Sequence, residues 1–188
     1  MATPTSLPAT FVAGNVLTAA QMNALRGSFR ILQVASTTKT DTFSASVASA
    51  GTTSVTGLSV SITPSSTSST IFVMASVAGC TVAGGDKPGT SFFQLTAAGS
   101  PILVGAAASN RTQLSAASLG LLSNQGFQTA TMQGIHSPAT TSSVTYGVDV
   151  FNVIGGTATV YVNRGPDDTD VALNPRTIST ITVMEVSA

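Results

Sequence analysis

Alternation of apolar and hydroxyl-bearing residues is the clearest pattern in this chain. In residues 54–64, SVTGLSVSITP, the apolar residues Leu58, Val60 and Ile62 are separated from one another by serines. Successive side chains of a β-strand point to opposite faces, so a period of two predicts a strand with one buried face and one hydroxyl-rich face.

Segments of the same kind recur along the chain and predict an all-β protein. They are rich in Val, Ile and Phe, and clusters of Gly, Pro, Ser or Asn separate them. The predicted strands span residues 29–36, 54–64, 70–79, 90–96, 101–106, 143–154, 157–163 and 177–186, and a weaker pattern between 105 and 135 predicts one or two more. Strands spaced by about ten residues, with no helix between them, are typical of an antiparallel β-sandwich of the jelly-roll type.

Three local patterns add detail to this prediction. Residues 70–79, TIFVMASVAG, form a nearly continuous apolar run, which is typical of a strand covered on both faces. The short segment AAGS at 97–100 predicts a hairpin loop. The pair Gly155-Gly156 predicts a second hairpin, between the strands at 143–154 and 157–163.

The helical signal of the chain lies in residues 17–28, LTAAQMNALRGS. Thr18 is a suitable N-cap, Gln21 follows at the capping-box spacing, and Gly27 stands where a helix-ending glycine belongs. These boundaries predict a helix of about two turns. Because an isolated helix shorter than about 12 residues is marginal in water, we expect it to dock against another surface.

The chain therefore divides into two regions. Residues 1–16 contain two prolines and predict an extended arm that needs a partner to become ordered. Together with the short α-helix this arm forms a docking region at 1–28, and residues 29–188 form the β-sandwich domain. The apolar side chains predicted to dock on a partner are Phe11, Leu17, Met22 and Leu25.

Composition narrows the classes of function. Charged residues make up 7% of the chain, against about 25% in an average globular protein, whereas serine and threonine account for 54 of the 188 residues. Such a surface suits contacts with neighbouring subunits. Seven basic and seven acidic residues leave no basic field for nucleic acid. We expect no membrane insertion, since no run of about 18 apolar residues occurs and no signal peptide is recognisable.

Candidate catalytic and metal-binding residues are few, and we expect neither an enzyme nor a metal or cofactor site. His136 lies beside a proline turn, without a nucleophile elbow in the chain, so a structural role is expected. Asp167, Asp168 and Asp170 suggest a calcium loop but lack the EF-hand order of ligands, which favours a solvated loop. For Glu185, within the last strand, an edge position or a salt bridge to an arginine is expected.

Carbohydrate binding is an alternative that a second group of residues suggests. Specific small-molecule sites combine apolar or aromatic surface with a few placed polar groups. Tyr161, Asn163 and Arg164, just before the acidic cluster, supply this combination and are the candidate glycan contacts.

Three segments resemble proteins of tailed bacteriophages. The first, LPATFVAGNVLTAAQMNALR, resembles the opening of many phage tail-associated proteins. The second, VASTTKTDTFSA with VTGLSVSITPSSTSSTIFVMASV, and the third, HSPATTSSVTYGVDV with VYVNRG and STITVMEVSA, resemble a β-rich module of tail-fibre and virion proteins, notably of marine and cyanobacterial phages. The chain departs from this pattern at Ala97-Ala98, where the module carries a charged residue.

The resemblance implies a non-enzymatic structural protein of the virion, made in the host cytoplasm. We expect a tail-fibre or tail-tip component that docks on other virion proteins through residues 1–28 and exposes its sandwich for assembly or host attachment. Fibre-like modules of this kind are usually trimers, so contacts with other copies are expected as well. A capsid decoration protein and a module that binds host surface glycans are the two alternatives.

Overall fold

The computed structural model describes residues 16, 18, 31–83, 91–118, 128–153 and 155–187. The arm and helix predicted over 1–28 lie outside the described residues, apart from Val16 and Thr18. The described strands are β1 (Ile31–Lys39), β2 (Phe43–Val47), β3 (Thr52–Ile62), β4 (Thr70–Ala83), β5 (Ser91–Ala97), β6 (Ser100–Ile102), β7 (Ala116–Ser118), β8 (Gln128–His136), β9 (Val144–Phe151), β10 (Ala158–Val162) and β11 (Ser179–Val186). No helix in this part of the chain is long and apolar enough to cross a membrane.

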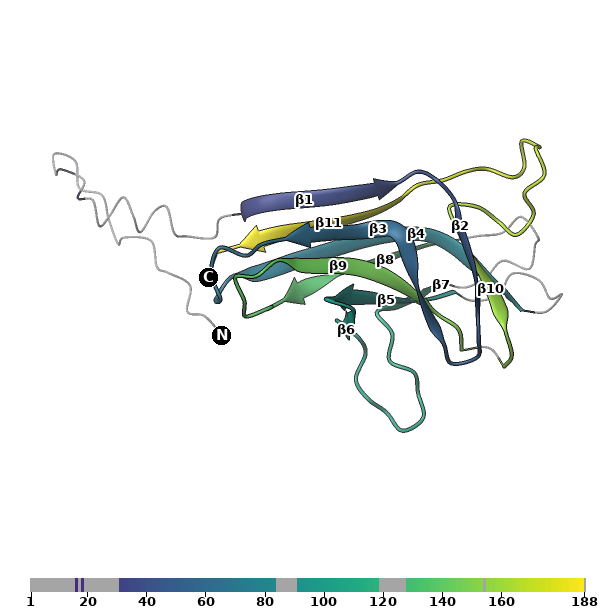
Figure 1. Ribbon diagram of the computed structural model, residues 1–188, viewed down its shortest axis with the longest axis horizontal. Coiled ribbons are helices and arrows are strands. Elements are labelled where there is room, and N and C mark those ends of the chain that lie inside the picture. The colour runs from purple at the N-terminus through teal and green to yellow at the C-terminus, as the bar shows by residue number, and fades with distance from the viewer. Residues whose placement is uncertain are drawn as a thin grey trace.

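Sheet A consists of β1, β2, β4, β8, β10 and β11 (Figure 1). The long strand β4 lies inside it and pairs with β8 along one edge. Along its other edge, β11 pairs with residues 70–76 and β10 with residues 79–83, so these two short strands lie end to end in one row. The strands β1 and β2 form the next row in the same way, because β1 pairs with β11 and β2 with β10.

Sheet B consists of β3, β5, β6, β7 and β9. Here β9 lies between β3 and β5. The outer edge of β5 is again shared by two short strands, since β7 pairs with residues 91–93 and β6 with residues 95–97. Every pairing between described strands is antiparallel.

The strand order confirms the predicted jelly-roll sandwich. When each end-to-end pair is taken as one row, the order in sheet A is β1/β2, β10/β11, β4, β8, and in sheet B it is β3, β9, β5, β6/β7. Apart from β5 and β6/β7, which follow one another within sheet B, successive rows along the chain alternate between the sheets, in the eight-strand, double Greek-key arrangement of a jelly roll.

The core fills the space between the two sheets. Alternate residues of β4 and β11 face alternate residues of β3, β5 and β9, as the period of two requires. The largest fully buried apolar side chains are Ile71, Val73, Val77, Val160 and Ile181 from sheet A, and Leu58, Phe93, Leu95, Tyr146, Val148 and Val150 from sheet B. The apolar positions of the pattern at 54–64 are thus the inward positions of β3.

One predicted hairpin is confirmed and the other is wrong. Strands β5 and β6 form a hairpin, and its two loop residues, Ala98 and Gly99, both have positive φ, as a two-residue primed turn requires. In contrast, β9 and β10 belong to different sheets, so Gly155-Gly156 lies in a crossover. The buried side chain of Asn152 supports the crossover by donating to the carbonyl oxygens of Val47 and Gly156.

The outer face of β4 differs from its sequence prediction. The inward residues Ile71 and Val73 are fully buried, but outward Phe72 is only half-buried and outward Met74 is 36% exposed. The continuous apolar run therefore belongs to a strand whose outer face is left partly open at Phe72 and Met74 by the described part of the chain.

Candidate functional site

The charged loop at 163–178 is the segment in which the predicted glycan contacts and acidic cluster meet. It leaves the sheet at the end of β10 and returns at the start of β11, although β10 and β11 lie in the same row. The row of strands is therefore continuous in the sheet, although the chain between β10 and β11 forms a loop of 16 residues.

Asn163 links the end of β10 to the start of β11. Its side chain is fully buried and its backbone has a φ of 62°, a left-handed conformation in which asparagine is enriched. Its Nδ2 group donates to the carbonyl oxygens of Lys39 and Asp41, both at 2.9 Å, and its Oδ1 accepts from the Ser179 hydroxyl at 2.6 Å. The side chain thus ties the β1–β2 break to the β10–β11 break.

The other two glycan candidates are accessible. Tyr161 is half-buried, and the guanidinium carbon of Arg164 lies 4.8 Å from the centre of its ring, within the range of a cation–π contact. The amide of Asn163, by contrast, is fully engaged inside the protein. Its predicted role as a glycan contact is replaced by a structural one, because a ligand would have to break three internal hydrogen bonds to reach it.

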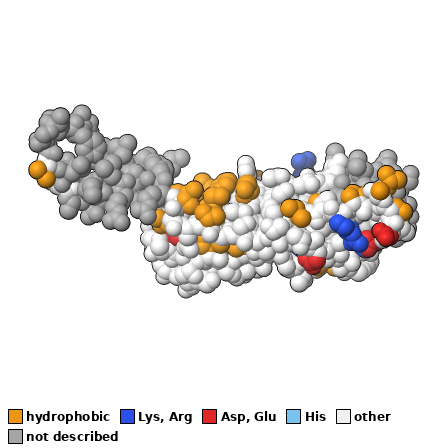
Figure 2. Space-filling view, turned by 90° about the horizontal axis from the view of Figure 1, so that it is seen from above, with side chains coloured by type: hydrophobic (Ala, Val, Ile, Leu, Met, Phe, Trp, Pro, Cys, Tyr) orange, Lys and Arg blue, Asp and Glu red, His pale blue; other side chains and the backbone are white. Residues whose placement is uncertain are grey.

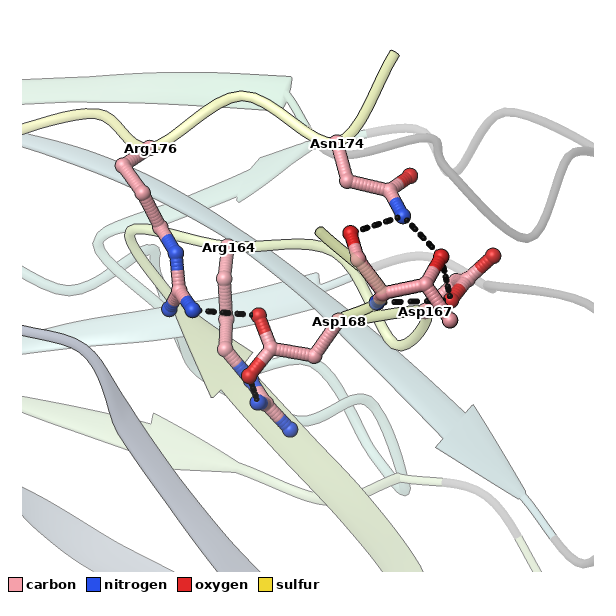
Figure 3. Close-up of polar contacts among 6 residues, drawn as sticks. Arg164, Asp167, Asp168, Asn174 and Arg176 are labelled. Atoms are coloured by element: carbon pink, nitrogen blue, oxygen red, sulfur yellow. Dashed lines mark hydrogen bonds and ion pairs between the residues drawn. The ribbon is translucent and has the colours of Figure 1, made fainter. Parts of the chain in front are cut away.

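Asp168 lies between two arginines (Figure 3). One carboxylate oxygen pairs with Arg164, four residues earlier, and the other lies 2.6 Å from Nη2 of Arg176. Because Arg176 and Asp168 are both substantially exposed, this network orders the loop more than it stabilises the fold.

Asp167 organises the turn next to this network. Its carboxylate accepts from the backbone N–H of Thr169 at 3.1 Å and from the Thr169 hydroxyl at 3.0 Å, and these bonds lower the pKa of Asp167. Asn174 donates to the carbonyl and hydroxyl oxygens of the same threonine (Figure 3). Among the described residues, no group of three or more His, Cys, Asp and Glu side chains is arranged to hold a metal ion.

His136 connects the two sheets. It ends β8, and its Nδ1 lies 2.9 Å from the hydroxyl of Tyr146 in β9, with the two rings edge to face. Burial lowers the pKa of His136 and raises the pKa of Tyr146 to about 12. The neutral imidazole and the neutral phenol therefore share one hydrogen bond across the end of the sandwich.

Glu185 has neither of the predicted environments. It lies in β11, between β1 and β4, and it is fully buried. Its carboxylate accepts from the Ser65 backbone N–H at 2.7 Å, from the Ser65 hydroxyl at 2.6 Å and from Gln33 Nε2 at 2.6 Å. Burial raises the pKa of Glu185, but hydrogen bonds from Ser65, Gln33 and Ser69 outweigh it and lower the pKa to about 2.

These neutral donors explain why the prediction for Glu185 was wrong. A buried carboxylate needs hydrogen bonds, and several neutral donors can supply them in place of a cation. The signal in the sequence is the serine-rich turn SSTSS at 65–69, which supplies a backbone N–H and hydroxyl groups. Its distance along the chain from residue 185 hides the pairing.

A row of apolar side chains crosses the outer face of sheet A. The register places Val34 of β1 opposite Met184 of β11, Met184 opposite Phe72 of β4, and Phe72 opposite Ile135 of β8. We call these four residues the apolar row. Val34 is 57% exposed and Ile135 is 61% exposed, so the two ends of the row are open to solvent.

The apolar row lies at the end of the sandwich where β1 begins and β11 ends. The next row toward the middle of the sheet is more polar and consists of Ser36, Thr182, Met74 and Gln133. Figure 2, which looks onto the β1 side, shows hydrophobic side chains gathered over the beginning of β1, whereas most charged side chains lie toward the other end. Sequence reasoning predicted the strands but missed the row, because it depends on the register of four strands that are distant in sequence.

Comparisons with known proteins found similar folds among solved structures. No protein-family description matches the chain, and no curated protein matches its sequence. The fold is similar to a chain in the structure of infectious bursal disease virus, Gx strain, with a TM-score of 0.36 and 11% sequence identity. The similarity covers 97% of this chain and 45% of the other, so this chain spans less than half the length of that viral chain.

Proposed function

We propose that this chain is a non-enzymatic structural protein of a tailed-phage virion, a tail-fibre or tail-tip component that assembles through its N-terminal region. The observation that carries the proposal is the apolar row, exposed at the end of the jelly roll where residue 31 enters the sheet. A contiguous apolar patch with a polar surround is typical of a surface that another protein covers.

Two further features support an assembly role. The resemblance of residues 7–26 and of the β-rich segments to phage tail-associated and virion proteins points to a particle component. The low content of charged residues, 7% of the chain, is compatible with surfaces that lie against neighbouring subunits. In this proposal Phe11, Leu17, Met22 and Leu25 dock on other virion proteins.

The direct test is incorporation into particles. Deletion of residues 1–28 is expected to leave a folded sandwich, because the described core involves residues 47–183, and to remove the protein from purified virions. The double variant Met22→Ser, Leu25→Ser is expected to have the same effect, whereas the matched control Asn23→Ala on the same predicted helix is expected to be incorporated normally. Normal incorporation of the deletion variant, measured by quantitative mass spectrometry of virions, would contradict the docking role.

Capsid decoration is the alternative location for the same structural role. Copy number separates the two locations, since a tail component is present in tens of copies or fewer and a decoration protein in hundreds. The same mass-spectrometric measurement, normalised to the major capsid protein, decides between them.

Host-glycan binding is a second candidate function, which the partly exposed Tyr161–Arg164 pair favours. An aromatic ring beside a cation and exposed carboxylates offers both stacking and hydrogen bonds to a sugar. On a glycan array, the full chain would bind a surface sugar, Tyr161→Ala would abolish that signal, and Thr159→Ala, two residues earlier on the same strand, would keep it. Absence of any signal from the full chain would contradict this function.

A further inference from the structure

We propose that the apolar row on sheet A receives the predicted N-terminal helix of another copy of this chain. The inference rests on the proposed assembly function and deepens it by naming the first partner of the helix. The helix between Thr18 and Gly27 would lie across Val34, Met184, Phe72 and Ile135 of its neighbour, with Met22 and Leu25 directed at the sheet.

The first argument is the pattern of β4. A continuous apolar run is typical of a strand with both faces covered, and the inner face of β4 is fully buried against sheet B. Its outer face carries half-buried Phe72 and the 36% exposed Met74, which the described residues leave partly open. A helix packed on this face would cover β4 on both sides, as its continuous apolar run predicts.

The second argument is the match in length. The apolar row spans four neighbouring strands, and three gaps of about 4.8 Å give a row roughly 14 Å long. A helix of about eight residues is roughly 12 Å long. One short helix therefore covers the row from β1 to β8, and its apolar side chains are spaced to contact the middle strands.

The third argument identifies another copy as the source of the helix. Val16, directly before the predicted helix, is 88% exposed, so its side chain is not packed against its own sandwich. The N-terminal region enters the sheet at Ile31, whose register partner Val186 is two residues from Met184 of the row. An N-terminal region therefore begins beside a row in every copy, and reciprocal exchange between copies covers all the rows.

Charge does not oppose this contact. The apolar row and the row next to it consist of apolar, hydroxyl-bearing and amide side chains only. The predicted helix contains a single charged residue, Arg26, in its last turn. Burial of the apolar side chains of both partners therefore requires no burial of an unpaired charge.

The test measures the mass of the purified full chain by size-exclusion chromatography with light scattering. The expected mass is a small multiple of the protomer mass of 18.7 kDa. Ile135→Asp in the row and Leu25→Asp in the helix are each expected to reduce the mass to that of the protomer. Thr131→Asp, on the same outer face of β8 but outside the row, is the matched control and is expected to keep the mass of the parent chain. Circular dichroism of each variant checks that the sandwich is folded.

Crosslinking identifies the occupant of the row. Benzoylphenylalanine at position 135, in a mixture of isotopically light and heavy copies, is expected to crosslink to residues 17–28 and to give peptide pairs of mixed isotope content. Crosslinks within one copy, crosslinks to the row of another copy, or a monomeric parent chain would each overturn the inference. A monomeric chain that still needs residues 1–28 for incorporation into virions would overturn the inference alone and leave the proposed function in place.

Discussion

The two ends of this jelly roll use polar groups in opposite ways. At the end where β1 begins and β11 ends, the carboxylate of Glu185 is buried among neutral donors, and the outer surface carries the apolar row. At the other end, the loop at 163–178 holds five of the charged residues of the chain, and its ion pair between Arg176 and Asp168 is substantially exposed. We refer to these as the terminal end and the loop end.

The comparison of the two ends distinguishes the residues that stabilise the fold from those that determine the surface. At both ends the polar groups that hold the fold are buried and hydrogen-bonded, namely Glu185 at the terminal end and Asn163 at the loop end. The two ends differ instead in their surfaces, which are apolar at the terminal end and charged at the loop end. Substitutions at buried polar positions are therefore expected to affect folding, whereas substitutions of exposed charges or of the apolar row affect association.

The largest effect is expected at the loop end, for Asn163→Ala. The substitution leaves the carbonyl oxygens of Lys39 and Asp41 without this donor and forces alanine into a left-handed conformation. The expected loss in the free energy of unfolding is about 3–4 kcal/mol, measured by urea denaturation. Asn163→Gly removes the same hydrogen bonds without the backbone strain, so it should lose about 1 kcal/mol less. Equal losses in both variants would show that strain does not contribute.

The next effect is expected at the terminal end, for Glu185→Gln. The substitution replaces a charged acceptor, which receives two hydrogen bonds from Ser65, with a neutral amide. The amide has an NH2 group in place of one carboxylate oxygen, and this group cannot accept a hydrogen bond. The expected loss in the free energy of unfolding at pH 7 is about 2 kcal/mol. Urea denaturation of both proteins at pH 7 measures it. A loss as large as that of Asn163→Ala would reverse the predicted order of the two ends.

Acid provides a second readout for Glu185. Because its pKa of about 2 in the folded state lies below the ordinary 4.5, its contribution to stability is present above pH 4.5 and is lost as the pH falls toward 2. The free energy of unfolding of the parent chain should therefore decrease in this range, by at most about 3 kcal/mol from this residue. Glu185→Gln should lack this component, so a parallel decrease in both proteins would contradict the assignment.

A smaller effect is expected for the bond between His136 and Tyr146. Tyr146→Phe removes the hydrogen bond at almost constant volume, and about 1 kcal/mol of stability should be lost. Because burial lowers the pKa of His136 in the folded state, stability should fall as the pH drops below the ordinary value of 6.5. The chain contains one histidine, so His136→Asn should remove the dependence between pH 7 and pH 5.5. An unchanged pH dependence in that variant would assign it to another group.

The smallest effect is expected for Arg176→Ala in the exposed network of the loop end. Arg176 is about half exposed and its partner Asp168 retains Arg164, so the loss should be below about 1 kcal/mol and should shrink in high salt. Thermal denaturation at low and high ionic strength measures both properties, with Arg176→Lys as the charge-preserving control. A loss comparable to that of Glu185→Gln would show that the exposed charges also hold the fold.

Most of the fold could be predicted from the sequence because the alternation of β3 and β9 records which residues face the core. Leu58, Val60 and Val148 occupy inward positions that follow directly from the period of two. The jelly-roll class followed from strand spacing, whereas the sheet to which each strand belongs did not. Gly155-Gly156 has the local signature of a hairpin, and only the tertiary pairing of β9 with sheet B and β10 with sheet A makes it a crossover.

The candidate sites were less predictable because they depend on distant partners. Glu185 and Ser65 are 120 residues apart, and Asn163 and Lys39 are 124 residues apart. A polar residue within a strand signals that a partner exists, but the sequence does not identify the partner. Phe11, Leu17, Met22 and Leu25 lie outside the described residues, so their docking role stays a prediction.

The loop between β10 and β11 is also a site at which the fold should tolerate inserted residues. The side chains of Asn163 and Ser179 join the end of β10 to the start of β11 by a direct hydrogen bond. This link between the two strands does not depend on the sequence of the loop between them. Residues 169–173 are exposed, and none of them belongs to the hydrophobic core. Foreign peptides inserted there are expected to be displayed on the protein surface without altering the register of the sheet.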